Sequence, residues 1–511
     1  MKKRVAKIIQ QRKRNIAKRI DRNTYPTHEG PVLNTPNIHY ELSERDRGMA
    51  YGGIGVIQKM VKQLGLDQVI NQNVHVFKIH NPYYESDHVL NIAYNHLCQG
   101  QCLEDIERLR NDEAYLDALG AVRIPDPTTE GDFCRRFDVE QIHHLQDAIN
   151  HVRLRVWQQQ DPSFFTKAVI DGDGTIAETT GECKQGMDLS YKGIWGYHPL
   201  VLSLANTQEP LFLVNRSGNQ TSSSGAAAYY SQAGVMCQQA GFKSIRFRGD
   251  TDFSQSAYLD GWDAQGYEFN FGFDAMPNLV KKAENLPETD WEPLERKPRY
   301  TVKTQPREKP VHVKAQLVKA KDFKNLQLQC EHVAEFDYRP TLCRKTYRMV
   351  VLRKNISVER GDQVLFEEIR YFFYITNDRV MSKAEIVFDA NQRCNQENLL
   401  DQLKNGVRSL RMPVDTLESN WAYMVMASLS WSLKSWLGLL LPTGGRWAQR
   451  RAEEKTAVMR MEFKQFCHYF IALPCQIIQS GRRVVYRLLG WNRYLPVLLR
   501  AFEFFARPLR C

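Results

Sequence analysis

Acidic side chains stand at two places where short apolar runs end. Asp171 and Asp173 close the run FFTKAVIDGDGT. Asp250 and Asp252 close SIRFRGDTDF, and Glu397 lies downstream in NQENLLDQLKNG. Carboxylate oxygens without a neighbouring His or Cys favour Mg²⁺ over zinc, with Mn²⁺ as a substitute. Three such groups suit two divalent ions roughly 4 Å apart, which activate the attacking oxygen and stabilise the leaving oxygen of a phosphodiester.

The elements around these acids predict the sheet that would gather them. Residues 164–176 read as a buried strand and 198–218 as a hairpin, followed by a helix at 223–241. A fourth strand, a second helix and a fifth strand complete the pattern up to residue 274. This order predicts an α/β fold, an RNase H-like mixed sheet flanked by helices. In such a sheet the first and fourth strands are neighbours, so one Asp from each can meet a Glu from a helix laid across them.

The flanking segments predict further parts. The predicted organisation is a basic arm and linker (1–50), a helical DNA-binding or dimerisation domain (51–160), the core (161–284 and 369–412), a β-rich insertion (285–368) and a helical basic C-terminal region (413–511). The pattern also predicts a helix starting at Asp126, and a helix containing Glu397 that is capped by Gly406. The apolar run Trp421–Leu441 contains Lys434, and we interpret it as a core helix, without a membrane span.

Positive charge is concentrated at the two ends of the chain. The net charge is +11, but residues 1–22 carry ten basic side chains against Asp21 alone, and residues 445–511 carry thirteen against four acids. The middle is therefore acidic, apart from a basic run at 296–321. This distribution indicates a polyanionic partner gripped by the ends, with a cation-requiring centre. The predicted DNA contacts of the arm are Lys2, Lys3, Arg4, Arg12, Lys13 and Arg14.

The pattern Arg393, three residues, Glu397, six residues, Lys404 resembles the R-(3)-E-(6)-K signature of DDE transposases of bacterial insertion sequences. On a helix these three positions share one face, so Glu397 can bind metal while Arg393 and Lys404 contact DNA phosphates. VIDGDGT resembles the first-strand motif of that family, in which a small residue and Thr follow the catalytic Asp. RGDTDF resembles the segment that carries its second Asp. The resemblance selects Asp173 and Asp250, although the residues alone leave Asp171 open as the first ligand.

The resemblance covers roughly residues 165–405 and includes YHPL at Tyr197–Leu200 and RSGN at Arg216–Asn219. One position departs from it, because Ala390 stands where the family has a Tyr that contacts DNA. The resemblance implies a Mg²⁺-dependent, two-metal-ion, cut-and-paste DNA transposase. It would bind inverted-repeat transposon ends and target DNA, and would act as a homodimer when two ends are paired. Eleven scattered cysteines and a start without an apolar signal segment fit a cytoplasmic, nucleoid-associated protein.

Three other hypotheses stay open at this point. A structure-selective nuclease would use the same core without joining DNA strands. A domesticated DNA-binding protein with a degenerate site would explain Ala390. A glycosyltransferase would use Asp171 and Asp173 as a DxD motif, but it leaves the basic ends and the Arg393–Glu397–Lys404 pattern unexplained.

Overall fold

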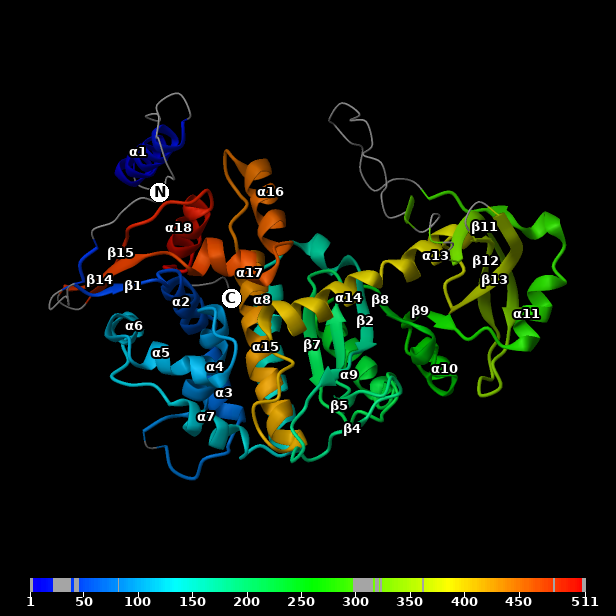
Figure 1. The fold of residues 1–511 in the computed structure, drawn as a ribbon, viewed down its shortest axis with the longest axis horizontal. Helices are drawn as coiled ribbons and strands as arrows, with labels where there is room; N and C mark the ends of the chain where they lie inside the picture. The colour runs from blue at the N-terminus through cyan, green and yellow to red at the C-terminus, as the bar shows by residue number, and fades with distance from the viewer. Residues whose placement is uncertain are drawn as a thin grey trace.

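The computed structural model shows a mixed α/β molecule built on one large sheet (Figure 1). It describes residues 3–21, 38–40, 46–80, 82–296, 316–317, 321, 324–360, 363–480 and 483–507. Lys2, most of the predicted linker and most of the basic run at 296–321 lie outside these residues, so what was predicted for them stays a prediction. None of the described helices is long and apolar enough to cross a membrane.

The large sheet has the strand order β10-β11-β12-β13-β9-β8-β2-β6-β7. Its strands near the acidic residues are β2 (Ala168–Gly174), β6 (Leu200–Leu204), β7 (Glu209–Val214), β8 (Ile245–Gly249) and β9 (Glu268–Phe273). β2 pairs antiparallel with β6 and parallel with β8, which pairs parallel with β9. The predicted contact between the first and fourth strands is confirmed. A small second sheet contains β3 (Ala177–Glu178), β4 (Asp188–Leu189) and β5 (Trp195–Tyr197).

A glycine lets a helix pack closely against the strand that ends in aspartate. Along β2, Asp171 and Asp173 point to one face of the sheet and Gly172 points to the other. A Cβ on Gly172 would lie 2.3 Å from the hydroxyl of Tyr230, which comes from α9 (Ala226–Ala240) and donates to the Arg248 carbonyl oxygen at 2.6 Å. The D-G-D spacing therefore separates a charged face from a close-packed aromatic one.

Gly172→Ala is expected to destabilise the protein by about 1–3 kcal/mol, because the new methyl group displaces Tyr230 from its hydrogen bond in a packed interior. Urea unfolding followed by circular dichroism measures the change. Gly261→Ala is the matched control, because Gly261 lies in α10 (Ser256–Ala264) and a Cβ there meets nothing within 4 Å. Equal stabilities of the two variants would contradict the close contact.

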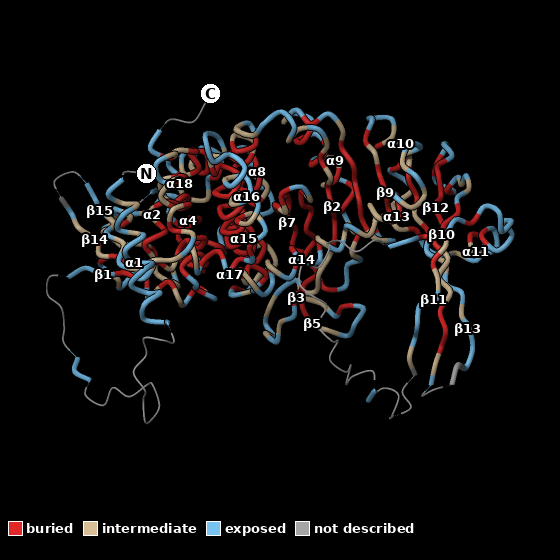
Figure 2. The backbone as a smooth tube through the Cα atoms, turned by 90° about the horizontal axis from the view of Figure 1, so that it is seen from above, coloured by how far each residue is buried: buried red, intermediate tan, exposed pale blue. Residues whose placement is uncertain are grey.

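The predicted β-rich insertion continues the large sheet instead of forming a sheet of its own. β13 pairs antiparallel with β9, and β12, β11 and β10 follow outward. The bounds are β10 (Glu292–Pro293), β11 (Lys324–Tyr338), β12 (Tyr347–Arg360) and β13 (Gln363–Thr376), with α11 (Pro277–Glu284) before them. Residue 368, the predicted end of the insertion, falls inside β13. Figure 2 shows the far ends of β11, β12 and β13 projecting from the body of the molecule.

The segment after the N-terminal arm is helical. Its helices are α2 (Ile54–Leu64), α3 (Leu66–Asn73), α4 (Glu85–Leu97), α5 (Ile106–Arg110), α6 (Glu113–Leu119), α7 (Pro127–Cys134) and α8 (Val139–Trp157). The helix predicted to start at Asp126 is confirmed, since the Asp126 side chain accepts a hydrogen bond from the Thr129 N–H at 2.9 Å. Side-chain capping satisfies an N–H group that the first helical turn leaves without a partner.

The run Trp421–Leu441 forms most of α15 (Leu417–Leu439), a buried helix that packs between the N-terminal helices and the sheet (Figures 1 and 2). It contacts α4 and α8 on one side and β7 on the other. Three indole N–H groups of α15 donate to β7 and the turn before it: Trp421 to Leu213 O, Trp431 to Gln208 O and Trp436 to Glu209 Oε1. The interpretation as a core helix is confirmed.

The C-terminal region differs from the helical tail that the sequence predicted. β14 (Cys475–Ser480) and β15 (Arg483–Leu488) form a hairpin, and β1 (Gly48–Met49) pairs antiparallel with β14. The helices of this region after α15 are α16 (Ala448–Met459), α17 (Phe463–Phe466) and α18 (Leu495–Phe504). Local periodicity could not predict the contact between β1 and β14, because the two strands lie near opposite ends of the chain.

Candidate active site

Asp173 and Asp250 stand at the ends of two adjacent parallel strands. Asp171 on β2 is in register with Arg248 on β8, so the positions two residues further on extend from the same edge and the same face. Asp173 is largely buried, and its Oδ1 accepts a hydrogen bond from the N–H of Gly174 at 2.8 Å. The sheet register thus brings the two predicted aspartates together.

Glu397 comes from α14 (Cys394–Asp401), which lies across β6 and β2. Gln396, the preceding residue, is buried, and its side chain fixes the helix to β6: its amide donates to Val201 O at 2.9 Å and its oxygen accepts from the Ser203 hydroxyl. The neighbouring Glu397 side chain remains 60% exposed. A buried amide therefore anchors the helix, while the carboxylate beside it stays available to a ligand.

Arg393 lies among the three carboxylates. Its Nη1 is 3.1 Å from Asp173 Oδ2 and its Nη2 is 3.7 Å from Glu397 Oε1. Burial lowers the pKa of Arg393, but the charges of Asp173, Asp250 and Glu397 raise it above its ordinary value. The structure therefore brings four of the predicted site residues into one group.

The group carries more negative charge than Arg393 neutralises. Burial, the largest cause, raises the pKa of Asp173 to about 7; Arg393 opposes this shift, and the charges of Asp250 and Glu397 add to it. Burial also raises the pKa of Asp250. A carboxyl group that keeps its proton close to neutral pH indicates concentrated, poorly solvated negative charge. Such a site attracts a cation.

The chemistry of these side chains fits a divalent metal ion. Asp173, Asp250 and Glu397 offer only carboxylate oxygens, the ligands that Mg²⁺ and Mn²⁺ prefer. In the described parts of the chain, no three His, Cys, Asp or Glu side chains lie close enough together to form a metal-binding group. Arg393 supplies the counter-charge in this arrangement.

The neighbouring acids of the two motifs are placed differently. Asp171 is fully buried and accepts two hydrogen bonds from Arg248, from Nε to Oδ1 at 2.8 Å and from Nη2 to Oδ2 at 2.9 Å. Asp252 is exposed, and its backbone N–H donates to Asp250 Oδ1 at 3.1 Å. The geometry favours Asp173 and Asp250 over these two alternatives.

Lys404 lies one element beyond Glu397. α14 continues into a π-helix, Gln402–Val407, and the exposed Lys404 donates from Nζ to Ile176 O at 2.8 Å, just past the end of β2. The predicted cap at Gly406 is wrong, because the left-handed residue that ends this helix is Arg408, with φ 63°. The sequence predicts one regular α-helix from Glu397 to Lys404, but the structure changes from α-helix to the wider π-helix at Gln402.

The chain matches a known protein family over most of its length. A family model described as Transposase DDE domain group 1 matches residues 48–504. The chain belongs to this DDE transposase family. Among curated proteins no match is found. Among solved structures, a cryo-EM structure of a piggyBac transposase synaptic complex with hairpin DNA is similar at 8% identity and a TM-score of 0.36, over 83% of this chain and 81% of that one. That likeness is too loose to support a shared fold.

Two other segments of this DDE transposase that resemble the family, YHPL and RSGN, lie beside the end of β2. Arg216, from RSGN, donates from Nε to the carbonyl oxygen of His198, from YHPL, at 2.9 Å, and from Nη1 to Ser222 O at 3.0 Å. A Cβ on Gly174 would lie 2.8 Å from His198 Nε2 and 3.4 Å from Arg216 Nη2. These side chains therefore pack against the backbone that follows Asp173.

The sequence pattern did not single out Arg248, Asp389 and Gln396, although all three contact the elements that carry the site. One signal was present in the sequence. R-G-D at 248–250 repeats the spacing of D-G-D at 171–173, with a residue of opposite charge in the first position. That spacing is the pattern expected when each of two paired strands carries a charged residue two positions before a proposed catalytic residue, on the same face of the sheet.

The basic arm of the transposase is a helix, α1 (Lys3–Ile20), next to β15 (Figure 1). Arg12 is partly buried and donates from Nη1 to Leu488 O and Gly490 O, both at 3.0 Å. Of the other predicted DNA contacts, Lys3, Arg4, Lys13 and Arg14 are exposed, and Lys2 lies outside the described residues. In this arrangement Arg12 attaches the arm, and exposed cations of α1 face solvent.

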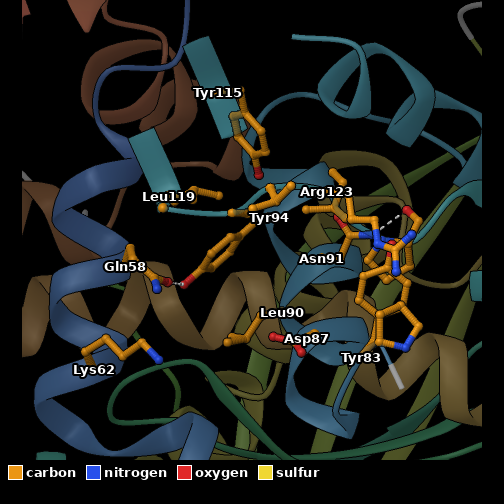
Figure 3. Close-up of a pocket in the computed structure, with 16 residues that line it drawn as sticks. Gln58, Lys62, Tyr83, Asp87, Leu90, Asn91, Tyr94, Tyr115, Leu119 and Arg123 are labelled. Carbon is orange, nitrogen blue, oxygen red and sulfur yellow. Dashed lines mark hydrogen bonds between the residues drawn. The ribbon is translucent and has the colours of Figure 1, made fainter. Parts of the chain in front are cut away.

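A cavity of about 460 Å³ lies elsewhere, among α2, α4, α6 and the loop at 120–125 (Figure 3). Its lining includes Tyr83, Tyr94 and Arg123, and the Tyr94 hydroxyl donates to Gln58 Oε1 at 2.5 Å. None of the predicted catalytic or DNA-binding residues lines it. It is separate from the carboxylate group.

Proposed function

We propose that this DDE transposase performs cut-and-paste DNA transposition at the ends of a bacterial insertion sequence, with Asp173, Asp250 and Glu397 as its catalytic residues. The observation that carries the proposal is the arrangement around Arg393, which pairs with Asp173 and Glu397 and whose pKa is also raised by the charge of Asp250. The strand order β7-β6-β2-β8-β9 supports an RNase H-like core, because the first strand lies between the second and the fourth.

The proposed chemistry is a series of in-line phosphoryl transfers at one site. A water oxygen attacks phosphorus at the transposon end, the P–O bond to the 3′-oxygen breaks, and that oxygen leaves as a 3′-hydroxyl. A further transfer of the same kind cuts the second strand, with the freed 3′-hydroxyl or a water as the attacking group, and the element is released. A 3′-hydroxyl of the released end then attacks a phosphodiester of target DNA, and the displaced target 3′-oxygen takes up a proton. Because every step has the same geometry, one set of side chains serves all of them.

Each site residue has a proposed role. Asp173, Asp250 and Glu397 would hold Mg²⁺, or Mn²⁺ in its place, as two ions. The bound metal supplies activation of the attacking oxygen and charge stabilisation at the leaving oxygen. Arg393 and Lys404 would contact phosphates next to the scissile bond, since Arg393 pairs with Asp173 and Lys404 contacts the backbone three residues after it. Asp173 must lose its proton to act as a ligand, so its raised pKa predicts that metal binding strengthens with pH up to about 7.

The proposed partners are transposon-end inverted repeats and target DNA, gripped by the basic arm, the insertion and the C-terminal region. Two ends must be held together for joining, so we propose a homodimer in the synaptic complex. The proposed location is the bacterial cytoplasm at the nucleoid. The proposed parts keep the ranges 1–50, 51–160, 161–284 with 369–412, 285–368 and 413–511, with one change. The boundary at residue 368 cuts β13, so the insertion extends to the end of that strand at Thr376.

The experiment is an excision and joining assay. The inverted repeats that flank the gene are placed on a supercoiled donor plasmid, and purified protein is added with Mg²⁺ and a target plasmid. The expected products are an excised element and joined target molecules that carry a short duplication. Cleavage without joining would favour a structure-selective nuclease, and end-specific binding without cleavage would favour a domesticated DNA-binding protein, to which Ala390 also points.

Deleting residues 1–22 is expected to weaken DNA binding and to flatten its salt dependence, because each lost phosphate contact reduces the slope of log K against log salt by about 0.9. Fluorescence anisotropy at several salt concentrations measures the slope. Lys13→Gln with Arg14→Gln should reduce it by about 2 while leaving α1 attached through Arg12. An unchanged slope in both variants would show that the arm does not touch DNA.

A further inference from the structure

Each of the three chain segments that lead to the carboxylates carries a second charged residue a few positions earlier in the sequence. Asp171 precedes Asp173 by two residues on β2, and Arg248 precedes Asp250 by two on β8. Residues two apart on a strand share a face, so these pairs form two layers of one charged surface. Asp389 lies near the end of α13 (Lys383–Asn391), and a short turn at 392–393 leads from α13 into α14, which carries Glu397.

Arg248 joins all three segments through a single guanidinium group. Its Nε and Nη2 donate to the two oxygens of Asp171 at 2.8 and 2.9 Å. Its Nη1 donates to the Asp389 carbonyl oxygen at 2.9 Å and to Asp389 Oδ1 at 3.1 Å. Arg248 and Asp171 are 2% and 1% exposed. The planar fork of arginine fixes both direction and distance of these contacts, which a lysine ammonium does not do.

The far side of Asp389 is fixed as well. Its Oδ2 accepts from Asn270 Nδ2 on β9 at 2.9 Å and from Arg246 Nη1 on β8 at 3.2 Å. Arg246 also pairs with Glu268 and Asp378. α13 is therefore held to β8 by ion pairs and to β9 by an amide hydrogen bond, in addition to apolar packing, which restricts how far the following α14 can shift along the sheet.

We infer that Arg248 is a positioning residue whose contacts to Asp171 and Asp389 set the separation of Asp173, Asp250 and Glu397. This inference rests on the proposed function, because it assigns a role relative to the proposed catalytic carboxylates. Buried ion pairs contribute little net stability compared with apolar packing, but they can specify one geometry among several. Here the specified geometry is that of β2, β8 and α13 at the point where each leads into the site.

The test compares Arg248→Lys and Asp389→Asn with the wild type. Both variants are expected to bind Mn²⁺ about 10–100-fold more weakly in the absence of DNA, as loss of an outer hydrogen-bond partner does at metal sites. The electron paramagnetic resonance signal of free Mn²⁺ measures this affinity. The kcat for cleavage of a transposon-end oligonucleotide should fall by a similar factor, while its KM stays within about twofold, because Arg248 is buried and Asp389 is engaged by Arg248, Asn270 and Arg246.

Glu209→Gln is the matched control. Glu209 on β7 is fully buried, pairs with Arg153 Nε at 3.2 Å and accepts from the indoles of Trp157 and Trp436. It belongs to the same sheet but contacts none of the carboxylate segments. This variant should lower the melting temperature at least as much as Arg248→Lys does, yet retain wild-type Mn²⁺ affinity and kcat.

The outcomes separate the two proposals. Wild-type Mn²⁺ affinity and kcat in both Arg248→Lys and Asp389→Asn would overturn the positioning role. An equal loss in Glu209→Gln would also overturn it, since the effect would then follow stability alone. A wild-type protein that neither binds Mn²⁺ nor cleaves DNA would overturn the proposed function as well. A loss confined to Arg248→Lys and Asp389→Asn supports both.

Discussion

Asp173→Asn, Asp250→Asn and Glu397→Gln are each expected to abolish Mg²⁺-dependent cleavage of a transposon-end oligonucleotide, by about 10³-fold or more. Catalytic groups that act as a unit lose most of the rate when any member is removed. Arg393 pairs with Asp173 and Glu397, and the charge of Asp250 also raises its pKa, so each substitution removes one proposed ligand from the same charged group. Binding of the oligonucleotide should remain, because phosphate contacts dominate affinity and lie on basic residues. Gel assays of cleavage and anisotropy of binding measure the two effects.

Asp252→Asn is the control for this series. Asp252 lies two residues from Asp250 but is exposed, and only its backbone N–H contacts that carboxylate. Cleavage at the wild-type rate is expected. If Asp252→Asn were inactive and Asp250→Asn active, the assignment within RGDTDF would be reversed. Full activity of Glu397→Gln would remove the basis for a three-carboxylate site.

Asp173→Asn is also expected to stabilise the metal-free protein at pH 8, by up to about 4 kcal/mol. Burial raises the pKa of Asp173 from 3.8 to about 7, and each unit corresponds to about 1.36 kcal/mol. Between these two values the folded state holds a proton that the unfolded state has released, so wild-type stability falls as pH rises from about 4 to about 7. Asn cannot ionise, so the variant lacks this loss.

Urea unfolding of the two proteins with a chelator present, at pH 5 and pH 8, measures this difference. The stability gain of Asp173→Asn should be about 1.6 kcal/mol at pH 5, because only about one of the three pH units has been passed, and nearly complete at pH 8. Added Mg²⁺ should stabilise the wild type more than the variant, because a ligand that binds only the folded state raises its stability. A gain independent of pH would show that Asp173 is not the titrating group. Asp252→Asn should show no pH-dependent gain.

The local sequence pattern could predict two parts of the site: the strands, and the spacing of the charged residues along them. D-G-D and R-G-D each follow an apolar run, and the resulting β2 and β8 are adjacent, as the order of elements predicted. Selecting Asp173 over Asp171 needed the resemblance to the family. The structure adds the physical reason, because Asp171 is held by Arg248.

Other features could not be predicted because they depend on contacts between distant parts of the chain. Arg393 was expected to face DNA phosphate, yet it also pairs with Asp173, which lies on a strand far away in the sequence. The sequence pattern predicts helix for the segment that forms the hairpin β14–β15, because the partner of this hairpin, β1, lies near the other end of the chain. Arg12 is one of the predicted DNA contacts, but it donates to backbone carbonyls at and just after the end of β15.

The pairing of β13 with β9 has a consequence for how this protein can be cut or recombined. The insertion is not a detachable module, because removing it would leave β9 as an unprotected edge with a row of unpaired N–H and C=O groups. Such an edge recruits strands from other molecules and promotes aggregation. A truncated core lacking residues 285–376 would therefore need a replacement strand beside β9, and grafts of this region between relatives must carry β13 with them.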